Sequence, residues 1–299
     1  MDPKKEIRLI AILGATASGK SALALEIAEL LDAAIFSLDS LSIYRGIDIA
    51  SAKPKISDRV RIKHYGIDML DVPELSNAAV FKHLLQQAIK DTDKKTLLIV
   101  GGSSFYLKSI IEGLSVMPLL SPEEKQALQK HIQAQKAPYE LLSCIDPLYA
   151  STIKPTDTYR THKGLEIYFS TNTPPSLYFK QHPKIPFEYA IELFGLKVPK
   201  EELQANIKAR TQQMIKDGII EEIAALIQKY PKDSQPFKAI GPKECIAYLE
   251  RPSSIDELQT QISLHTTQLA KRQTTFNKTQ FQQIHTQSKE EILSTLTRT

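Results

Sequence analysis

The chain has 299 residues, 42% of them hydrophobic and 24% charged, which is an ordinary globular composition with enough length for one large domain plus an insertion. The formal net charge of +4 permits a polyanionic partner without requiring one. The two cysteines, Cys144 and Cys245, exclude a disulfide framework and a zinc motif, and they favour a reducing, cytoplasmic setting. No apolar run has the length of a membrane span, and the N-terminal one is too short for a signal peptide.

Short apolar runs alternate with helical patterns in the first part of the chain. Residues 7–13, 33–38 and 96–100 are predicted to be strands, because each is a compact apolar run that stops at glycine or aspartate. Helical spacing follows the first run, and another helix is expected over 103–112. This alternation predicts an α/β fold with a parallel sheet, whose ligands gather at the carboxyl ends of the strands.

The sequence pattern of residues 118–186 predicts that they form a small all-helical insertion domain. Three residues there are expected to cap helices, namely Ser121 (with Pro122 and Glu124 in a capping box), Asp146 and Asp157. Gly164 is expected to interrupt the third of these helices. A strand over 190–198 then returns the chain to the sheet, and long helices follow from Lys200. We therefore expect a core domain of residues 1–117 and 187–299.

Residues 14–21, with the sequence GATASGKS, match the phosphate-binding pattern GxxxxGK[ST] in full. A predicted strand before them and a helix after them supply the context that this motif requires. The backbone amides would form an anion cradle at the start of the helix. Lys20 would add a positive charge, and the Ser21 hydroxyl could hold a magnesium ion. The sequence predicts a diphosphate or triphosphate site at Gly14, Ala15, Thr16, Ala17, Ser18, Gly19, Lys20 and Ser21.

The carboxylate nearest to this loop is expected at Asp39, directly after the second strand. Phosphate-loop ATPases and GTPases place a metal-ordering aspartate after a later strand, but here residues 96–100 run into Gly101, Gly102 and Ser103. A motor or switch NTPase is therefore disfavoured. Asp39 occupies a position suited to a general base, but an aspartate followed by serine is also a turn signal. The spacing alone leaves both interpretations open.

A second charged feature lies near the C-terminus, where no acidic residue occurs between Leu258 and Lys289. Basic and aromatic side chains alternate there with glutamine and threonine: His265, Lys271, Arg272, Phe276, Lys278, Phe281 and His285. Such a segment can lie along the phosphates of a nucleic acid. It can equally be a solvated helix face with aromatic side chains that pack inward.

Several longer motifs follow the phosphate loop in a fixed order. They are DSLSIYRGIDIASAKP at 39–54, HYGIDMLD at 64–71, VGGSSFYLKSIIEGL at 100–114, DTYRTHKGLEIY at 157–168, RTQQMIKDGIIEEI at 210–223, AIGPKE at 239–244 and LAKRQTTF at 269–276. Together they resemble the bacterial tRNA dimethylallyltransferases, which prenylate adenosine 37 beside the anticodon. The resemblance extends over about residues 8–278, and its DSxxxYRGxDIxxAKP pattern is far more specific than the phosphate loop.

The resemblance implies a phosphate-loop NTPase-like core and a prenyl transfer in which diphosphate is the leaving group. Dimethylallyl diphosphate would bind to the loop together with Mg²⁺, which Ser21 would help to hold. Asp39 corresponds to the base that accepts a proton from N6 of adenine. Ser103 would support the leaving oxygen, and Arg210 would neutralise the diphosphate.

The resemblance also implies contacts with the anticodon stem-loop of tRNAs that read codons starting with U. Adenosine 37 must leave the base stack to reach the cavity. The residues assigned to tRNA are Asp39, Ser40, Leu41, Ser42 and Ser104 in the core, Tyr159, Arg160, Thr161, His162 and Lys163 in the insertion, and Lys271 and Arg272 near the C-terminus. The insertion would grip the anticodon arm, and the enzyme is expected to be a cytoplasmic monomer.

This chain departs from the common family pattern at several positions. Ala15 replaces proline, Tyr159 glutamine, Lys163-Gly164 arginine-alanine, Pro242 tyrosine and Thr267 arginine. These changes affect the expected grip on tRNA, because lysine cannot contact a phosphate in the bidentate manner of arginine. Three alternatives stay open. They are a small-molecule kinase, a prenyltransferase acting on free adenine nucleotides, and a non-catalytic nucleotide-dependent RNA-binding protein.

Overall fold

The structure is a computed structural model that describes residues 6–297. The chain forms two compact units. The first comprises the described residues up to Ile111 together with those from Glu188 onward, and the second comprises Glu112–Phe187. Within residues 6–297, no helix is long and apolar enough to cross a membrane.

The first unit is built on a parallel sheet of six strands in the order β3-β2-β4-β1-β5-β6. The strands are β1 (Arg8–Leu13), β2 (Ala34–Ser37), β3 (His64–Tyr65), β4 (Thr96–Val100), β5 (Ile191–Leu196) and β6 (His285–Gln287). From β1 and its neighbour β4 the chain continues toward opposite edges of the sheet. A crevice therefore forms between their carboxyl ends, where ligands bind in folds of this kind. The predicted α/β fold with a parallel sheet is confirmed.

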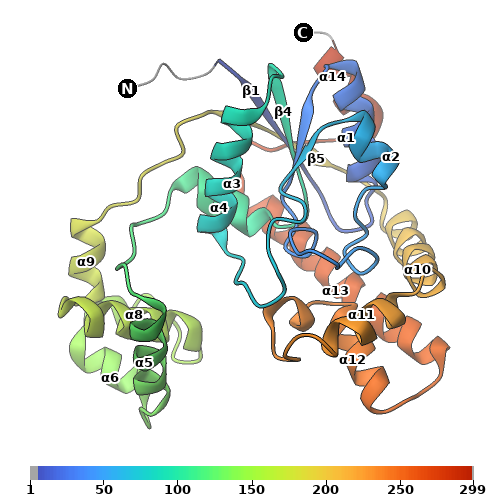
Figure 1. Ribbon diagram of the computed structural model, residues 1–299. Helices are drawn as coiled ribbons and strands as arrows, with labels where there is room; N and C mark the ends of the chain where they lie inside the picture. Colours follow the sequence, from blue (N-terminus) through green and yellow to red (C-terminus); the bar gives the residue numbers. More distant parts are fainter. Residues whose placement is uncertain (1–5, 298–299) are drawn as a thin grey trace. The chain divides into compact units, whose positions relative to one another are not determined.

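Helices cover both faces of this sheet (Figure 1). On one face, α1 (Lys20–Leu30) and α14 (Lys289–Thr297) bury apolar side chains against alternate residues of β1, including Ile10 and Ile12. On the other face lie α3 (Ala78–Asp91) and α4 (Ser104–Glu112). There the ring of Phe81 meets Phe36 of β2 edge to face. Successive side chains of a strand point to opposite faces of the sheet. A strand that is buried on both faces therefore needs apolar residues at consecutive positions.

The remaining helices of the first unit are α2 (Ile56–Arg61), α10 (Lys200–Lys216), α11 (Ile219–Ile227), α12 (Pro242–Glu250) and α13 (Ile255–Gln280), with a 3₁₀ turn, η1 (Gln235–Lys238). Helix α10 packs against α13, and α11 packs against α12. The prediction that long helices follow from Lys200 to the C-terminus was wrong at β6, which pairs in parallel with β5. This three-residue strand is partly exposed and polar, so it lacks the apolar run that marks the central strands.

The second unit consists of α5 (Pro122–Gln133), α6 (Pro138–Ile145), α7 (Pro147–Ala150), α8 (Thr158–Thr171) and α9 (Pro175–Gln181). Its own apolar core is centred on Ile132, Leu142, Ile153 and Leu165. The three predicted caps are present, and the side chains of Ser121, Asp146 and Asp157 each accept a backbone amide of the following helix. Ser121 and Glu124 form the full capping box.

The predicted interruption at Gly164 is wrong, because α8 is continuous through this residue. A Cβ atom at Gly164 would come within 2.8 Å of the Tyr149 ring and 3.0 Å of Leu142. Glycine therefore allows α8 to approach α6 and α7 closely. This close packing compensates for the roughly 1 kcal/mol by which glycine weakens a helix relative to alanine.

Candidate active site

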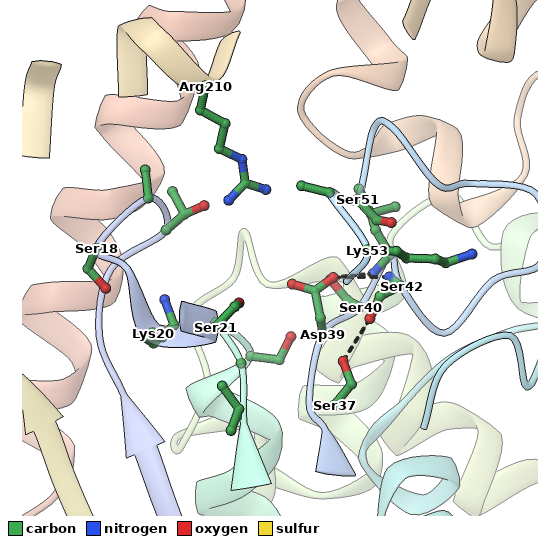
Figure 2. Close-up of a pocket in the computed structure, with 18 of the residues that line it drawn as sticks. Ser18, Lys20, Ser21, Ser37, Asp39, Ser40, Ser42, Ser51, Lys53 and Arg210 are labelled. Atoms are coloured by element: carbon green, nitrogen blue, oxygen red, sulfur yellow. Dashed lines mark hydrogen bonds between the residues drawn. The ribbon is translucent and has the colours of Figure 1, made fainter. Parts of the chain in front are cut away.

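A cavity of about 890 Å³ opens at the carboxyl ends of β1, β2 and β4. Its walls are the phosphate loop, residues 39–42 after β2, residues 50–55, the segment 101–105 after β4, and side chains from α10 and α13. Figure 2 shows the phosphate loop on one side of this space and Asp39 on the other. The cavity thus occupies the crevice that the strand order creates.

The phosphate loop turns sharply from β1 into α1. Ala17 and Gly19 adopt left-handed backbone conformations with φ of 61° and 85°. Of the five successive backbone amides from residue 17 to residue 21, four have no hydrogen-bond partner within the described chain. The exception is Ser18, whose amide donates to the Ala15 carbonyl at 3.2 Å. The free amides are those of Ala17, Gly19, Lys20 and Ser21. At a helix N-terminus such amides form a binding site for an anion.

Lys20 is the first residue of α1 and is only 7% exposed. Its ammonium group donates to the Ala15 carbonyl at 2.5 Å. Burial, and to a lesser extent the positive charge of Arg210, lowers the pKa of Lys20 to about 8, while Asp39 acts in the opposite direction. A bound diphosphate would place negative charge next to this buried ammonium group and so stabilise its charged form.

Arg210 projects from α10 toward the same space. Figure 2 shows its guanidinium directed into the cavity between the phosphate loop and Asp39. Burial lowers the pKa of Arg210, and the negative charge of Asp39 opposes that shift. Arginine nevertheless stays charged in proteins. Lys20, Arg210 and the Asp39 carboxylate therefore face a space large enough for a diphosphate ester.

Asp39 closes a turn and also faces the cavity. Its Oδ1 accepts the backbone amides of Leu41 at 2.9 Å and Ser42 at 3.1 Å. Its other oxygen, Oδ2, has no hydrogen-bond partner among residues 6–297, and Figure 2 shows it on the cavity side. The two interpretations that the sequence left open are thus compatible, because one oxygen builds the turn and the other is available to a ligand.

Serines from two further loops line the cavity. Ser103 is half-buried, and its backbone amide donates to the Leu38 carbonyl at 3.3 Å, which places it beside the end of β2. The buried hydroxyl of Ser104 has no partner within the described chain. The hydroxyl of Ser42 lies 2.9 Å from that of Ser37. Ser40 and Leu41 line the cavity beside Asp39.

Of the basic residues expected near the C-terminus, four lie on α13, namely His265, Lys271, Arg272 and Lys278, whereas His285 lies in β6. Lys271 and Arg272 are exposed, and neither has an ion-pair partner in the described part of the chain. Arg272 also lines the cavity, together with Phe276, whose ring meets Phe105 edge to face. By contrast, Phe281 is buried, and His265 contacts the Glu244 carboxylate at 2.7 Å. Helix α13 therefore combines an exposed basic patch with aromatic packing.

The candidate tRNA residues of the second unit all lie at the start of α8. Tyr159 is 71% exposed, and Arg160 is exposed beside Asp157, 3.5 Å away. Lys163 is paired with Glu166 at 2.6 Å, and His162 is half-buried. Thr161 is only 2% exposed, and its hydroxyl lacks a partner within residues 6–297. Tyr159 and Arg160 are thus presented to solvent, whereas Thr161 faces the core of this unit.

Three residues that organise the site lie inside the quoted motifs, but the sequence did not indicate their roles. The Glu222 carboxylate of α11 accepts the amides of Asp48, Ile49 and Ala50 at 2.7–3.0 Å, and so holds the segment that continues into the cavity wall. Lys53 is buried and donates to the Tyr44 carbonyl at 2.7 Å and to Asp48 and Asp68. The third residue is Gln273 of α13. In the sequence, these three residues are distinguished only by their position inside the quoted motifs.

The fold and the cavity define a phosphate-loop protein with a carboxylate opposite its anion site. The profile of the family named IPP transferase matches residues 42–280. The chain is 56% identical over 290 residues to a protein of Helicobacter pylori named tRNA dimethylallyltransferase, with 97% of this chain and 92% of that protein covered. A protein of the same name from Wolinella succinogenes is 46% identical, with 98% and 100% covered.

Solved structures agree with this assignment. A tRNA delta(2)-isopentenylpyrophosphate transferase from Staphylococcus epidermidis is 28% identical, with a TM-score of 0.68 and coverage of 98% of this chain and 99% of that one. A tRNA isopentenylpyrophosphate transferase from Bacillus halodurans is 26% identical, with a TM-score of 0.70 and coverage of 98% and 95%. The chain belongs to the IPP transferase family, so the predicted family, phosphate-loop fold and enzyme class are confirmed.

Proposed function

We propose that the protein transfers the dimethylallyl group of dimethylallyl diphosphate to N6 of adenosine 37 in tRNAs that read codons starting with U. The observation that carries this proposal is the free Oδ2 of Asp39, which faces the phosphate loop across one cavity in a member of the IPP transferase family.

The phosphate loop and two cations favour departure of the diphosphate. The free amides at the start of α1 would bind its oxygens, and Lys20 and Arg210 face the same space. Negative charge builds on the departing oxygen as the bond between carbon and oxygen breaks. Fixed positive groups in a partly dry cavity stabilise that charge more strongly than water does. The Ser103 hydroxyl would donate a hydrogen bond to the same oxygen.

Asp39 provides for the incoming amine. N6 of adenine is a weak nucleophile because its lone pair is delocalised into the ring. A new bond forms between N6 and the first prenyl carbon, the bond from that carbon to the diphosphate breaks, and one N6 proton must leave. Oδ2 of Asp39 is the acceptor for that proton. Because Oδ1 is fixed by Leu41 and Ser42, the carboxylate would stay oriented during the transfer.

The residues present fit a magnesium ion that binds together with the diphosphate. No group of three or more histidine, cysteine, aspartate or glutamate side chains within residues 6–297 is arranged to hold a metal. Mg²⁺ commonly takes one or two protein oxygens, substrate phosphates and water, and the exposed Ser21 hydroxyl at the start of α1 is such an oxygen. Bound there, Mg²⁺ would neutralise charge on the leaving diphosphate.

The anticodon loop of tRNA would bind over the cavity opening. Adenosine 37 would flip into the cavity, where Asp39, Ser40, Leu41, Ser42 and Ser104 would contact it or its neighbours. Lys271 and Arg272 would contact phosphates. We assign Tyr159, Arg160, His162 and Lys163 of the helical unit to the anticodon arm, and we include a monomeric state and a cytoplasmic location in the proposal.

The test is an incubation of the purified protein with Mg²⁺, labelled dimethylallyl diphosphate and unmodified tRNA that carries A36-A37, followed by nucleoside mass analysis. AMP and ATP serve as parallel acceptors. We expect label on N6 of A37 in the tRNA sample alone. Label on AMP would instead support a nucleotide prenyltransferase, and ATP turnover without label transfer would support a kinase.

A further inference from the structure

The side chain of Gln273 joins two loops of the cavity. Its Oε1 accepts the backbone amide of Thr16 in the phosphate loop at 2.8 Å, and its Nε2 donates to the carbonyl of Gly102, after β4, at 2.9 Å. Gln273 lies on α13 directly after Lys271 and Arg272. One planar amide thus spans the phosphate loop and the segment that leads into Ser103.

Gly102 is shaped to receive this contact. A Cβ atom at that position would lie 2.5 Å from Nε2 of Gln273, which is closer than real Cβ atoms approach a neighbour. A side chain at residue 102 would therefore displace the amide group of Gln273 from this position, and the φ of Gly102 does not lie in the left-handed region. The absence of a side chain at Gly102 leaves room for the Gln273 amide, and the Gly102 carbonyl accepts its hydrogen bond.

The contact also occupies one backbone amide of the phosphate loop, which is then not free to bind an anion. The Thr16 amide is engaged by Gln273, whereas the amides of Ala17, Gly19, Lys20 and Ser21 are free. Glutamine is suited to this role because it offers one acceptor and two donors on a rigid plane. Glutamate in its charged form could accept from Thr16 but would repel the Gly102 carbonyl, and methionine could do neither.

We propose that Gln273 is a positioning residue, which holds the diphosphate-binding loop in register with Ser103 and so aligns the two groups that act on the leaving diphosphate. This inference rests on the proposed function. A displacement of about 1 Å in such an arrangement can lower a rate about 100-fold. Its amide oxygen and amide nitrogen each bond a backbone group of the protein, so Gln273 acts in this proposal through the two loops that it joins.

The first experiment compares Gln273→Met with Gln261→Met, a control that changes an exposed glutamine of the same helix. We expect Gln273→Met to lower the single-turnover rate roughly 10- to 100-fold and to weaken binding of inorganic diphosphate with Mg²⁺. The affinity for tRNA should stay close to that of the control, whereas the melting temperature should fall modestly, because the Thr16 amide and the Gly102 carbonyl lose their partner. If Gln273→Met matches the control in rate and in diphosphate affinity, the proposal is wrong.

The second experiment uses the pH dependence of Gln273→Glu. The protonated carboxyl group can accept from Thr16 and donate to Gly102, whereas the charged form cannot donate. The ratio of the variant rate to the wild-type rate should therefore rise as the pH falls into the range where a glutamate is protonated. A ratio that stays constant with pH would contradict the proposal, since a general packing defect would not respond to protonation of this group.

A double-mutant cycle with Gly102→Ala then tests whether the contact itself is responsible. If both single changes break the same contact, the double variant should lose no more diphosphate affinity than either single one. Independent, additive losses would overturn the proposal. Diphosphate affinity also separates this inference from the proposed function, because it can be measured even if the wild-type protein prenylates no tRNA.

Discussion

Oδ1 of Asp39 accepts the backbone amide of Ser42 at 3.1 Å, while Oδ2 of the same carboxylate has no partner within residues 6–297. The two oxygens therefore make separable contributions, one to the turn and one to the reaction. Asp39→Asn keeps an acceptor for Ser42 and removes the base. We expect it to lower the single-turnover rate about 100-fold or more, with tRNA affinity and melting temperature retained.

Asp39→Ala should show the same loss of rate and also a lower melting temperature, because the amides of Leu41 and Ser42 lose their acceptor. The control is Asp58→Asn, which neutralises another carboxylate that lines the cavity. Its rate should stay near that of the wild type. A normal rate in Asp39→Asn would remove Asp39 as the base.

The buried ammonium group of Lys20 predicts a pH dependence of diphosphate binding. In the free protein the pKa of Lys20 is lowered to about 8, chiefly by burial. A bound diphosphate favours the charged form and so raises this pKa. Below about pH 8 the proton is already present, and affinity should not change because of Lys20. Above pH 8, binding must take up a proton, so affinity should fall by at most tenfold per pH unit.

Titration calorimetry with inorganic diphosphate and Mg²⁺ between pH 7 and 10 would measure this effect. Lys20→Arg is the matched control, because arginine keeps its charge over the whole range. The difference in pH dependence between the two proteins isolates the lysine from every other group that titrates. Parallel curves would show that Lys20 is not the group responsible.

Features with a local signal could be predicted from the sequence, and those set by distant contacts could not. Strand β1 is apolar from Leu9 to Leu13 and leads into a complete phosphate-loop motif, so both its position and its function could be predicted from the sequence. The caps at Ser121 and Asp157 follow from local backbone chemistry. Gly164 was misread because a glycine in a helix is a local weakness, and only its packing against Tyr149 explains why α8 continues.

The same distinction holds for the site. The sequence placed Asp39 after a strand, but it could not show that its two oxygens face different partners. Glu222 and Gln273 act on backbone amides more than 170 residues away along the chain. A glutamate or glutamine on an amphipathic helix carries no signal of such a contact. These roles depend on tertiary packing, which the hydrophobic pattern alone does not specify.

Thr161 offers a test of the residue assignments that came from the resemblance. Its hydroxyl is buried in the helical unit without a partner among the described residues. Thr161→Val removes that unsatisfied group and keeps the branched shape. We expect the free energy of unfolding to rise by about 1 kcal/mol, with tRNA affinity unchanged within about twofold.

Chemical denaturation and tRNA titration measure the two effects of Thr161→Val. Thr158→Val, at an exposed position of the same helix, is the control and should give no gain in stability. A tenfold loss of tRNA affinity in Thr161→Val alone would show that the hydroxyl reaches the RNA, and that α8 rearranges when tRNA binds.

Lys271 and Arg272 predict a measurable change in the salt dependence of tRNA binding. Both are exposed on α13 without an ion-pair partner in the described chain, and Arg272 reaches the cavity wall. Each phosphate contact adds about 0.7 to 0.9 to the slope of log affinity against log salt. Changing both residues to alanine should therefore weaken binding and reduce that slope by about 1.4 to 1.8.

The control for this experiment is the double variant Lys90→Ala with Lys95→Ala, which loses the same two positive charges. Lys95 directly precedes β4, so it lies at the amino edge of the sheet, opposite the cavity, and both lysines are exposed. The same reduction of slope in both double variants would indicate a general effect of net charge. A reduction confined to Lys271 and Arg272 would place tRNA phosphates along α13, where Gln273 ties the same helix to the phosphate loop.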